Sequence, residues 1–224
     1  MGNESDPHRW GTEPLLSGFV VKNNIIMTTK VNILIDGGFF TQKFREANNR
    51  VPKAQDVQNE VDCIMQKLRA KTNNETNDIL FRVYYYDCKP FDGVVKDHTG
   101  KEDVDFSTSK LCKASTLYLY DICKLEKFAV RLGELSFDGW KQDLHNKEKW
   151  RPDFKQKGVD MKVGLDMALM GLKHTCDKIV LVAGDSDFIA PIKFVRKEGL
   201  QVYLYAMGHK VKGHLIEHCD FKLS

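Results

Sequence analysis

Apolar residues recur along this chain in five short runs, and a stretch with helical periodicity separates each run from the next. The runs are rich in Val, Ile, Leu, Phe and Tyr, which favour β-strands. They lie at residues 31–36, 79–86, 128–134, 178–183 and 201–206. Because the runs are nearly continuous, with few polar interruptions, we expect strands that are covered on both faces.

The stretches between these runs predict helices. They lie at residues 40–48, 53–71, 107–126, 161–174 and 187–198. Strands that alternate with helices favour an α/β fold, a three-layer sandwich around a mostly parallel sheet. Two connections, 87–106 and 136–158, are longer than a crossover needs and predict long loops.

Composition narrows the class of protein. A chain of 224 residues with 42% apolar and 29% charged residues is typical of one soluble globular domain. Its formal net charge of +3 is too small to identify a nucleic-acid-binding protein. The six cysteines form no CxxC pair, which argues against a zinc finger and favours reduced thiols in the cytoplasm. No apolar run reaches 18 residues, so we expect no membrane span.

The N-terminal segment differs from the rest of the chain. Residues 1–26 mix Gly, Asn, Pro and charges without periodicity, and they lack the layout of a signal peptide. We expect a disordered extension, or sequence translated upstream of a natural start at Met27. The folded domain is then predicted to span residues 27–224.

Aspartates follow two of the predicted strands. Asp36 closes the first strand and is followed by two glycines, and Asp185 and Asp187 follow the fourth strand. In a parallel sheet, ligands bind beyond the carboxyl ends of the strands where the strand order reverses. If the two strands are neighbours, the three carboxylates converge there. Such carboxylates are costly to bring together unless a cation lies between them, which indicates an acidic metal site.

Asp160 lies at the start of a predicted helix and has two interpretations. It suits the N-cap of that helix, and it could also point at the shared crevice. Asp166 lies about 240° further around the same helix, so we interpret it as a buried structural carboxylate. Ser186 could orient a water or a phosphate oxygen, or could cap a helix.

Oxygen ligands without nearby His or Cys suit Mg²⁺ or Mn²⁺ better than Zn²⁺, and hydrolysis of a phosphodiester is the chemistry that such a site performs. Other classes lack their motifs. The first strand is not followed by GxGxxG, and the chain has no GxxxxGK[ST] loop, so we expect no nucleotide cofactor. Gly38 stands where a haloacid-dehalogenase-like phosphatase would need a second Asp.

Three motifs together resemble the NYN domain family of PIN-like, metal-dependent ribonucleases, closest to its bacterial LabA-like branch. They are Ile33–Phe40, Gln156–Asp160 with Asp166, and Val180–Phe188, and the resemblance covers roughly residues 31–223. It implies a PIN-like Rossmannoid fold with strand order 3-2-1-4-5. It also implies that Asp36, Asp160, Asp185 and Asp187 match the acidic metal-binding and catalytic positions.

The resemblance implies a divalent-metal-dependent endoribonuclease that acts on RNA, with DNA as another substrate of PIN-like domains. Phosphates would be held by cations beside the acidic motifs, for which we select Lys157, Lys193 and Arg196, together with Ser186. Phe39 stands where many members have Asn, which removes one polar ligand. The alternative is therefore a non-catalytic regulator that binds RNA or a protein partner. A single chain leaves a homo-oligomer open.

Overall fold

The five predicted strands form the centre of one seven-stranded sheet in a computed structural model that describes residues 27–73, 75–143, 146–211 and 213–223. The predicted extension at residues 1–26 lies outside the described residues. The sheet order is β6-β5-β2-β1-β7-β8-β9. Its strands are β1 (Met27–Asp36), β2 (Thr76–Lys89), β5 (Phe128–Gln142), β6 (Trp150–Lys157), β7 (Lys178–Val182), β8 (Gln201–Tyr205) and β9 (Phe221–Leu223).

The predicted α/β class is confirmed, and the five predicted strands lie in the order 3-2-1-4-5 as β5-β2-β1-β7-β8. The sheet differs from the prediction at both edges, where β6 and β9 add strands that the apolar runs did not reveal. All neighbouring strands are parallel except β5 and β6, which pair antiparallel.

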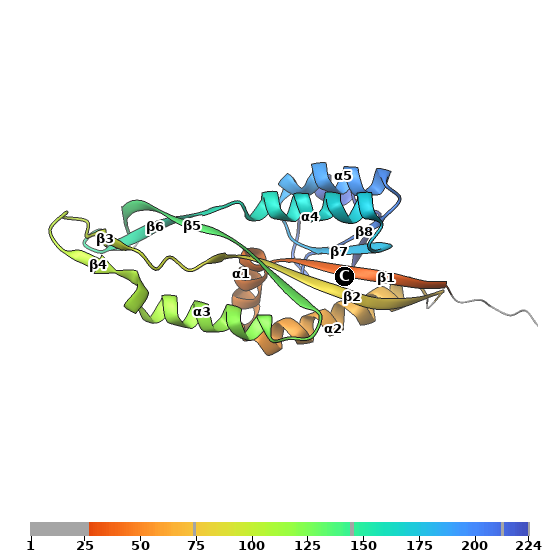
Figure 1. Cartoon of the computed structure of the whole chain (residues 1–224), viewed down its shortest axis with the longest axis horizontal. Coiled ribbons are helices and arrows are strands. Elements are labelled where there is room, and N and C mark those ends of the chain that lie inside the picture. The colour runs from red at the N-terminus through yellow and green to blue at the C-terminus, as the bar shows by residue number, and fades with distance from the viewer. Residues whose placement is uncertain (1–26, 74, 144–145, 212, 224) are drawn as a thin grey trace, which may run out of the picture.

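Helices cover both faces of this sheet (Figure 1). One face carries α1 (Gly37–Asn48), α2 (Ala54–Lys71) and α3 (Lys110–Cys123), and the other carries α4 (Val159–Lys173) and α5 (Ile189–Lys197), with the short α6 (Gly213–Glu217) nearby. Alternate residues of the strands feed two separate cores. In β1, for example, Ile33 and Ile35 face α1 and α2, whereas Leu34 faces α4. The result is a three-layer sandwich.

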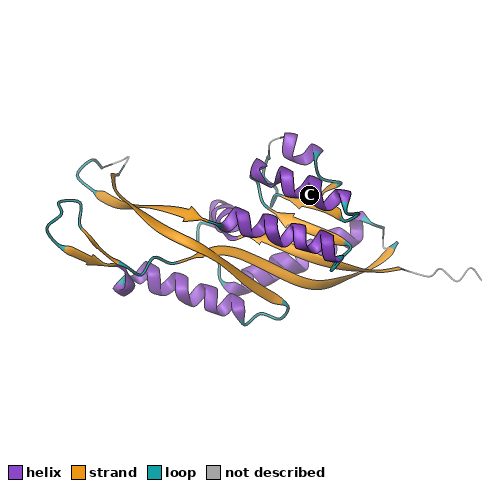
Figure 2. Cartoon of the chain, turned by 45° about the horizontal axis from the view of Figure 1, so that its top comes forward, coloured by secondary structure: helices purple, strands orange, loops and turns teal. Residues whose placement is uncertain are grey.

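The predicted loop at 136–158 is wrong, because most of it forms an antiparallel hairpin. β5 continues past the parallel sheet to Gln142 and pairs with β6, and the small hairpin of β3 (Val94–Lys96) and β4 (Asp103–Asp105) lies beside it (Figure 2). We call these two hairpins the arm. Aromatic rings from the two predicted loops pack together there and give the arm a small core of its own: Phe91, Phe106, Phe137, Trp140 and Phe154.

A buried ion pair joins three neighbouring strands at the opposite edge from the aspartates. Lys178 Nζ of β7 lies 2.6 Å from Asp78 Oδ1 of β2, and their side chains are 5% and 0% exposed. Thr29 of β1 and Thr76 also donate hydrogen bonds to Asp78. All three donors bind Asp78 Oδ1, so this one oxygen links β2, β1 and β7 and helps to fix their register.

None of the helices in the described part of the chain has the length and apolarity that crossing a membrane requires.

Candidate acidic centre

The order of the strands brings two of the predicted aspartates together at the carboxyl ends of neighbouring strands, in the middle of the sheet. β1 and β7 are parallel neighbours with Ile35 opposite Val182, so Asp36 ends its strand level with the residues that lead into Asp185. The order reverses between these two strands, since β2 lies on one side of β1 and β8 on the far side of β7. This is the position where open parallel sheets bind ligands.

Asp36 and Asp185 are both held by the turns that follow them. Asp36 caps α1, where its Oδ1 accepts a hydrogen bond from the Phe39 N–H at 3.1 Å. Asp185 accepts one from the Asp187 N–H at 3.1 Å at the start of a short helical turn, Ser186–Phe188. One oxygen of each carboxylate is thereby fixed by the backbone, which sets the direction of the other oxygen.

Asp160 is in the first turn of α4, but it does not cap the helix. The N-cap is Gly158, whose backbone has a φ of 78° that favours glycine, and it makes no side-chain capping bond. The N-cap interpretation of Asp160 is therefore wrong. Because the cap position is already filled by backbone geometry, the Asp160 carboxylate is left exposed at the N-terminal end of the helix.

The pKa values of the Asp36 and Asp160 carboxyls are both raised, in part by charges of neighbouring aspartates. Burial raises the pKa of the Asp36 carboxyl, and the charges of Asp160 and Asp185 raise it further. Partial loss of hydration also raises the pKa of the exposed Asp160 carboxyl, with added repulsion from Asp185 and Asp187. The residues come from β1, α4 and the turn after β7, so three separate elements deliver negative charge to one place.

Asp87 is a fifth carboxylate that the sequence prediction missed, because we ended its strand at residue 86. β2 continues to Lys89 and pairs Tyr86 with Asp36, so Asp87 lies one residue beyond Asp36 on the neighbouring strand. Burial raises the pKa of Asp87 to about 6, and the charge of Asp36 contributes. A Cβ on Gly37 would lie 2.9 Å from the Asp87 carboxylate, so glycine is needed for this close approach.

We expect the stability of the protein to depend on pH through Asp87. Its pKa rises from 3.8 to about 6 on folding, so the folded state keeps a proton that the unfolded chain releases. Stability contributed by this group falls as pH rises from about 4 to about 6, and the loss is complete above that range. Asp87→Asn should therefore gain at most about 3 kcal/mol over wild type at pH 7.5, and little at pH 4.

Urea unfolding of wild type and Asp87→Asn in EDTA at the two pH values measures this difference. The other acidic residues titrate in both proteins, so the difference between the two isolates Asp87. The same difference at both pH values would contradict the assignment.

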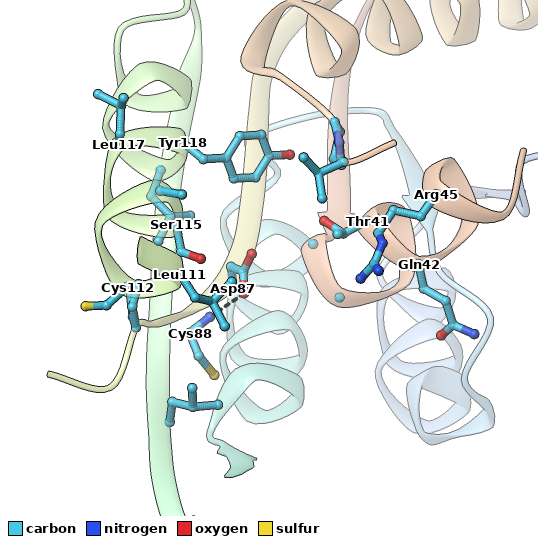
Figure 3. Close-up of a pocket in the computed structure, with 18 of the residues that line it drawn as sticks. Thr41, Gln42, Arg45, Asp87, Cys88, Leu111, Cys112, Ser115, Leu117 and Tyr118 are labelled. Atoms are coloured by element: carbon cyan, nitrogen blue, oxygen red, sulfur yellow. Dashed lines mark hydrogen bonds between the residues drawn. The ribbon is translucent and has the colours of Figure 1, made fainter. Parts of the chain in front are cut away.

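A groove of about 1240 Å³ opens beside the acidic centre. It reaches Gly37, Gly38 and Asp87 at its inner end and runs between α1 and α3. In Figure 3, Thr41, Gln42 and Arg45 project from α1 on one side and Leu111, Ser115, Leu117 and Tyr118 from α3 on the other, with Asp87 and Cys88 between them. On the side of α1 the groove is lined by Arg45 and Glu46, and the turn after α1 adds Lys53 and Arg50, which pairs with Asp56. The wall of α3 is largely apolar.

Phe39 packs against the backbone after β7. A Cβ built on Gly184 would lie 2.6 Å from the Phe39 ring, so the ring lies directly on this glycine. The aromatic side chain therefore fills space between the turns that carry Asp36 and Asp185, and it offers no polar atom to a ligand.

The residues predicted to hold phosphates lie in different places. Lys157 ends β6 and is exposed just before α4, Ser186 begins the turn after Asp185, and Lys193 is exposed on α5. Arg196, by contrast, lies in the last turn of α5 and donates to Asp220, whose other oxygen accepts the N–H of Val202 near the start of β8. The strands of a parallel sheet begin at the end opposite the aspartates. The contact of Arg196 with Asp220 is therefore structural and lies away from the acidic centre.

Asp166 makes structural contacts, as predicted, but it is only half-buried and its partners are side chains. Its Oδ2 accepts a hydrogen bond from the Tyr86 hydroxyl at 3.0 Å and pairs with Arg131 at 3.1 Å. These contacts join α4 to β2 and β5 and direct the carboxylate away from the acidic centre.

The donor set fits a hard divalent cation, although no ready cage is formed. Within the described residues, no group of three or more His, Cys, Asp or Glu side chains is arranged to hold a metal ion. Even so, the donors are carboxylate oxygens, which Mg²⁺ and Mn²⁺ prefer. A cation among Asp36, Asp160 and Asp185 would also remove the repulsion that raises the pKa values of Asp36 and Asp160.

Comparisons with known proteins match the C-terminal half of the chain to one family. Residues 112–223, half of the chain, match the NYN domain. The matched range contains Asp160, Asp185 and Asp187, and Asp36 precedes it. A protein of unknown function from Vibrio parahaemolyticus RIMD 2210633 is similar in structure, with 16% identity, 88% of this chain and 92% of that chain covered, and a TM-score of 0.47. No curated protein matches the chain.

Proposed function

Since the chain belongs to the NYN domain family, we propose that it is a divalent-metal-dependent endoribonuclease that hydrolyses RNA phosphodiester bonds. The family is associated with a PIN-like nuclease fold. The observation that supports the proposal is the placement of Asp36 and Asp185 at the ends of two neighbouring parallel strands where the strand order reverses, with Asp160 near enough for its charge to raise the pKa of Asp36. Carboxylates held together in this way are stabilised by a bound cation.

In this proposal, Asp36, Asp160, Asp185 and Asp187 hold Mg²⁺ or Mn²⁺. When bound, the metal would supply an activated water and stabilise charge on the phosphate oxygens. The protein supplies orientation, because the N–H groups of Phe39 and Asp187 fix one oxygen each of Asp36 and Asp185. Asp87 adds negative charge from the neighbouring strand and lies where the groove meets the centre.

Phosphates leading into the centre are held by cations at its rim. We assign this role to Lys157 and Lys193, with Ser186 as a donor to a phosphate or water, and to Arg45 on the α1 side of the groove. Arg196 is not included, because Asp220 and the His218 carbonyl already bind its guanidinium. RNA is the proposed substrate, and DNA is the comparison substrate for the assay.

Cleavage of RNA should require a divalent metal. Purified protein is incubated with a fluorescently end-labelled single-stranded RNA in Mn²⁺, in Mg²⁺ and in EDTA, and the products are resolved on a gel. We expect cleavage with either metal, none in EDTA, and recovery when Mn²⁺ is restored. Cleavage that persists at the same rate in EDTA would overturn the metal-dependent mechanism, and cleavage of matched DNA alone would overturn the choice of substrate.

The alternative is a regulator that binds RNA without cleaving it. The Phe39 ring on Gly184 favours it, because an apolar ring stands where a polar ligand would support a metal. This alternative predicts RNA binding that weakens with salt and no turnover in any metal. Turnover by the wild type that Asp36→Ala abolishes would exclude it.

We further propose that the protein is cytoplasmic and belongs to the LabA-like branch. All six cysteines are free thiols in the structure, which is typical of a reducing compartment. The branch rests on the aspartate motifs described above.

A further inference from the structure

The outer face of α4 is apolar and uncovered. Met161, Leu165, Leu169 and Leu172 are 70%, 64%, 48% and 61% exposed, whereas the opposite face of the same helix is buried in the sheet core through Val163, Met167 and Met170. A helix with apolar residues on two opposite faces is typical of one that packs between two partners. Here the described residues supply a partner on one side only.

The apolar surface continues from α4 to its neighbour. α5 packs along α4, with Pro191 3.9 Å from a Cβ built on Gly164 and Glu198 3.3 Å from one built on Gly171. Both helices lie on the same face of the sheet, so the outer sides of both point away from it (Figure 1). Phe194 of α5 is also 37% exposed. The patch therefore runs along the outer side of α4 and reaches Phe194 of α5, rather than being a single side chain.

The spacing of the stripe fits another helix. Met161, Leu165, Ala168 and Leu172 are separated by four, three and four residues, which is the spacing of a coiled-coil seam. The spacing is also the same when read backwards. Such a seam is complementary to itself in an antiparallel arrangement, as a two-fold symmetric interface requires.

We propose that the outer face of α4 is a homodimer interface in which α4 packs antiparallel against α4 of a second copy. A two-fold axis between Asp166 and Met167 sets Leu165 opposite Ala168 of the second copy, a large side chain against a small one. It also sets Met161 opposite Leu172 of the second copy. A large residue thus faces a small one near the two-fold axis, and two large residues face each other at each end of the seam, as in close-packed helix pairs.

The flanks of the seam agree with this arrangement. Lys162 lies at the edge of the seam, level with Gly171 of the second copy and within one turn of its Leu169, so its aliphatic stem covers that leucine while the ammonium stays in water. Lys173 lies further from the seam and faces solvent. The two helix dipoles are antiparallel, which is favourable. Lys162 also lies within one turn of Lys173 of the second copy, but both ammonium groups stay in water outside the seam, so no charge is buried within it.

The area is sufficient for a dimer of moderate affinity. Four large side chains, each about half exposed or more, present on the order of 400 Å² of apolar surface per copy, and a pair hides roughly 800 Å². The stems of Lys162 and the rim of α5 bring the total to roughly 1,000 Å², the lower bound for specific interfaces. Asp160 lies at one end of each α4, so the two acidic centres would lie at opposite ends of the helix pair, roughly 20 Å apart.

Sedimentation velocity of the full chain tests the proposal between about 1 and 100 μM, the range in which an interface of this area dissociates. We expect a monomer–dimer equilibrium for the wild type. Leu165→Glu should weaken the dimer at least about 100-fold, because two unpaired carboxylates would be buried in the seam. Tyr120→Glu is the control, since Tyr120 is 59% exposed on α3 and should leave the dimer unchanged.

A second set of variants tests the register. Leu165→Ala and Ala168→Leu should each weaken the dimer, and the double variant should regain most of the affinity because it restores a large residue opposite a small one. A wild type that stays monomeric at 100 μM, or a dimer that Leu165→Glu leaves intact, would overturn the proposal. Binding of monomers to anionic vesicles that Leu165→Glu removes would overturn it too, in favour of a membrane-facing role. None of these readouts depends on RNA cleavage.

Discussion

Replacing Asp185 with Asn is expected to lower metal-dependent RNA cleavage by roughly 10³-fold or more, because members of one metal site are lost as a unit. Asn keeps the size of Asp and its oxygen still accepts the Asp187 N–H, so the turn after β7 should be retained. What the variant removes is a negative charge that now raises the pKa values of Asp36 and Asp160. Rates at saturating Mn²⁺ measure the effect.

A matched control separates charge at the centre from charge elsewhere. Asp103→Asn removes an exposed carboxylate of the arm, which pairs with Lys96, and should cleave at the wild-type rate. Asp36→Asn with Asp185→Asn together should be hardly slower than either alone. If Asp185→Asn cleaves as fast as Asp103→Asn, the acidic centre is not the site of the reaction.

Lys178→Met is expected to destabilise the fold by about 3–5 kcal/mol, since it leaves the Asp78 carboxylate buried without its cation. The remaining hydrogen bonds from Thr29 and Thr76 cannot neutralise the charge. The melting temperature should fall by roughly 10 °C. Thermal unfolding followed by circular dichroism measures the loss, and Lys113→Met, on the exposed side of α3, should change little.

The pair of Lys178 and Asp78 also allows a test of whether the unpaired charge causes the loss of stability. Lys178→Met combined with Asp78→Leu should recover most of the lost stability, because an apolar pair of similar volume replaces a buried ion pair at little net cost. Recovery in the double variant with a large loss in each single variant would identify the unpaired charge as the reason. If Lys178→Met has the same melting temperature as the wild type, water already reaches Asp78.

The centre of the fold could be predicted from the sequence because each central strand is an uninterrupted apolar run. β7, for example, is fully buried from Lys178 to Val182. An apolar run this short that is followed by a glycine favours a strand over a helix. The arm could not be predicted in this way. β6 is an edge strand that is exposed at both ends and half-buried only from Pro152 to Phe154, so it shows neither an apolar run nor a strand-like alternation.

Most aspartates of the acidic centre could be identified from the sequence, but their structural roles could not all be predicted. Asp36 and Asp185 follow apolar strands, so strand adjacency alone brings them together. Asp87 was missed because β2 runs three residues beyond its apolar run, a length that only pairing with β5 explains. Gly158 took the capping role expected of Asp160, since a left-handed backbone conformation is not visible in a single sequence.

The position of β7 has a consequence for folding kinetics. β1 must pair with a strand about 150 residues later in the chain, as Val31 does with Lys178. Until β7 is synthesised and docked, one edge of β1 exposes the backbone groups of buried residues such as Ile33 and Ile35. Folding of the nascent chain therefore passes through a stage with an open, apolar strand edge, which is the stage most exposed to aggregation. The acidic centre forms only when that edge closes.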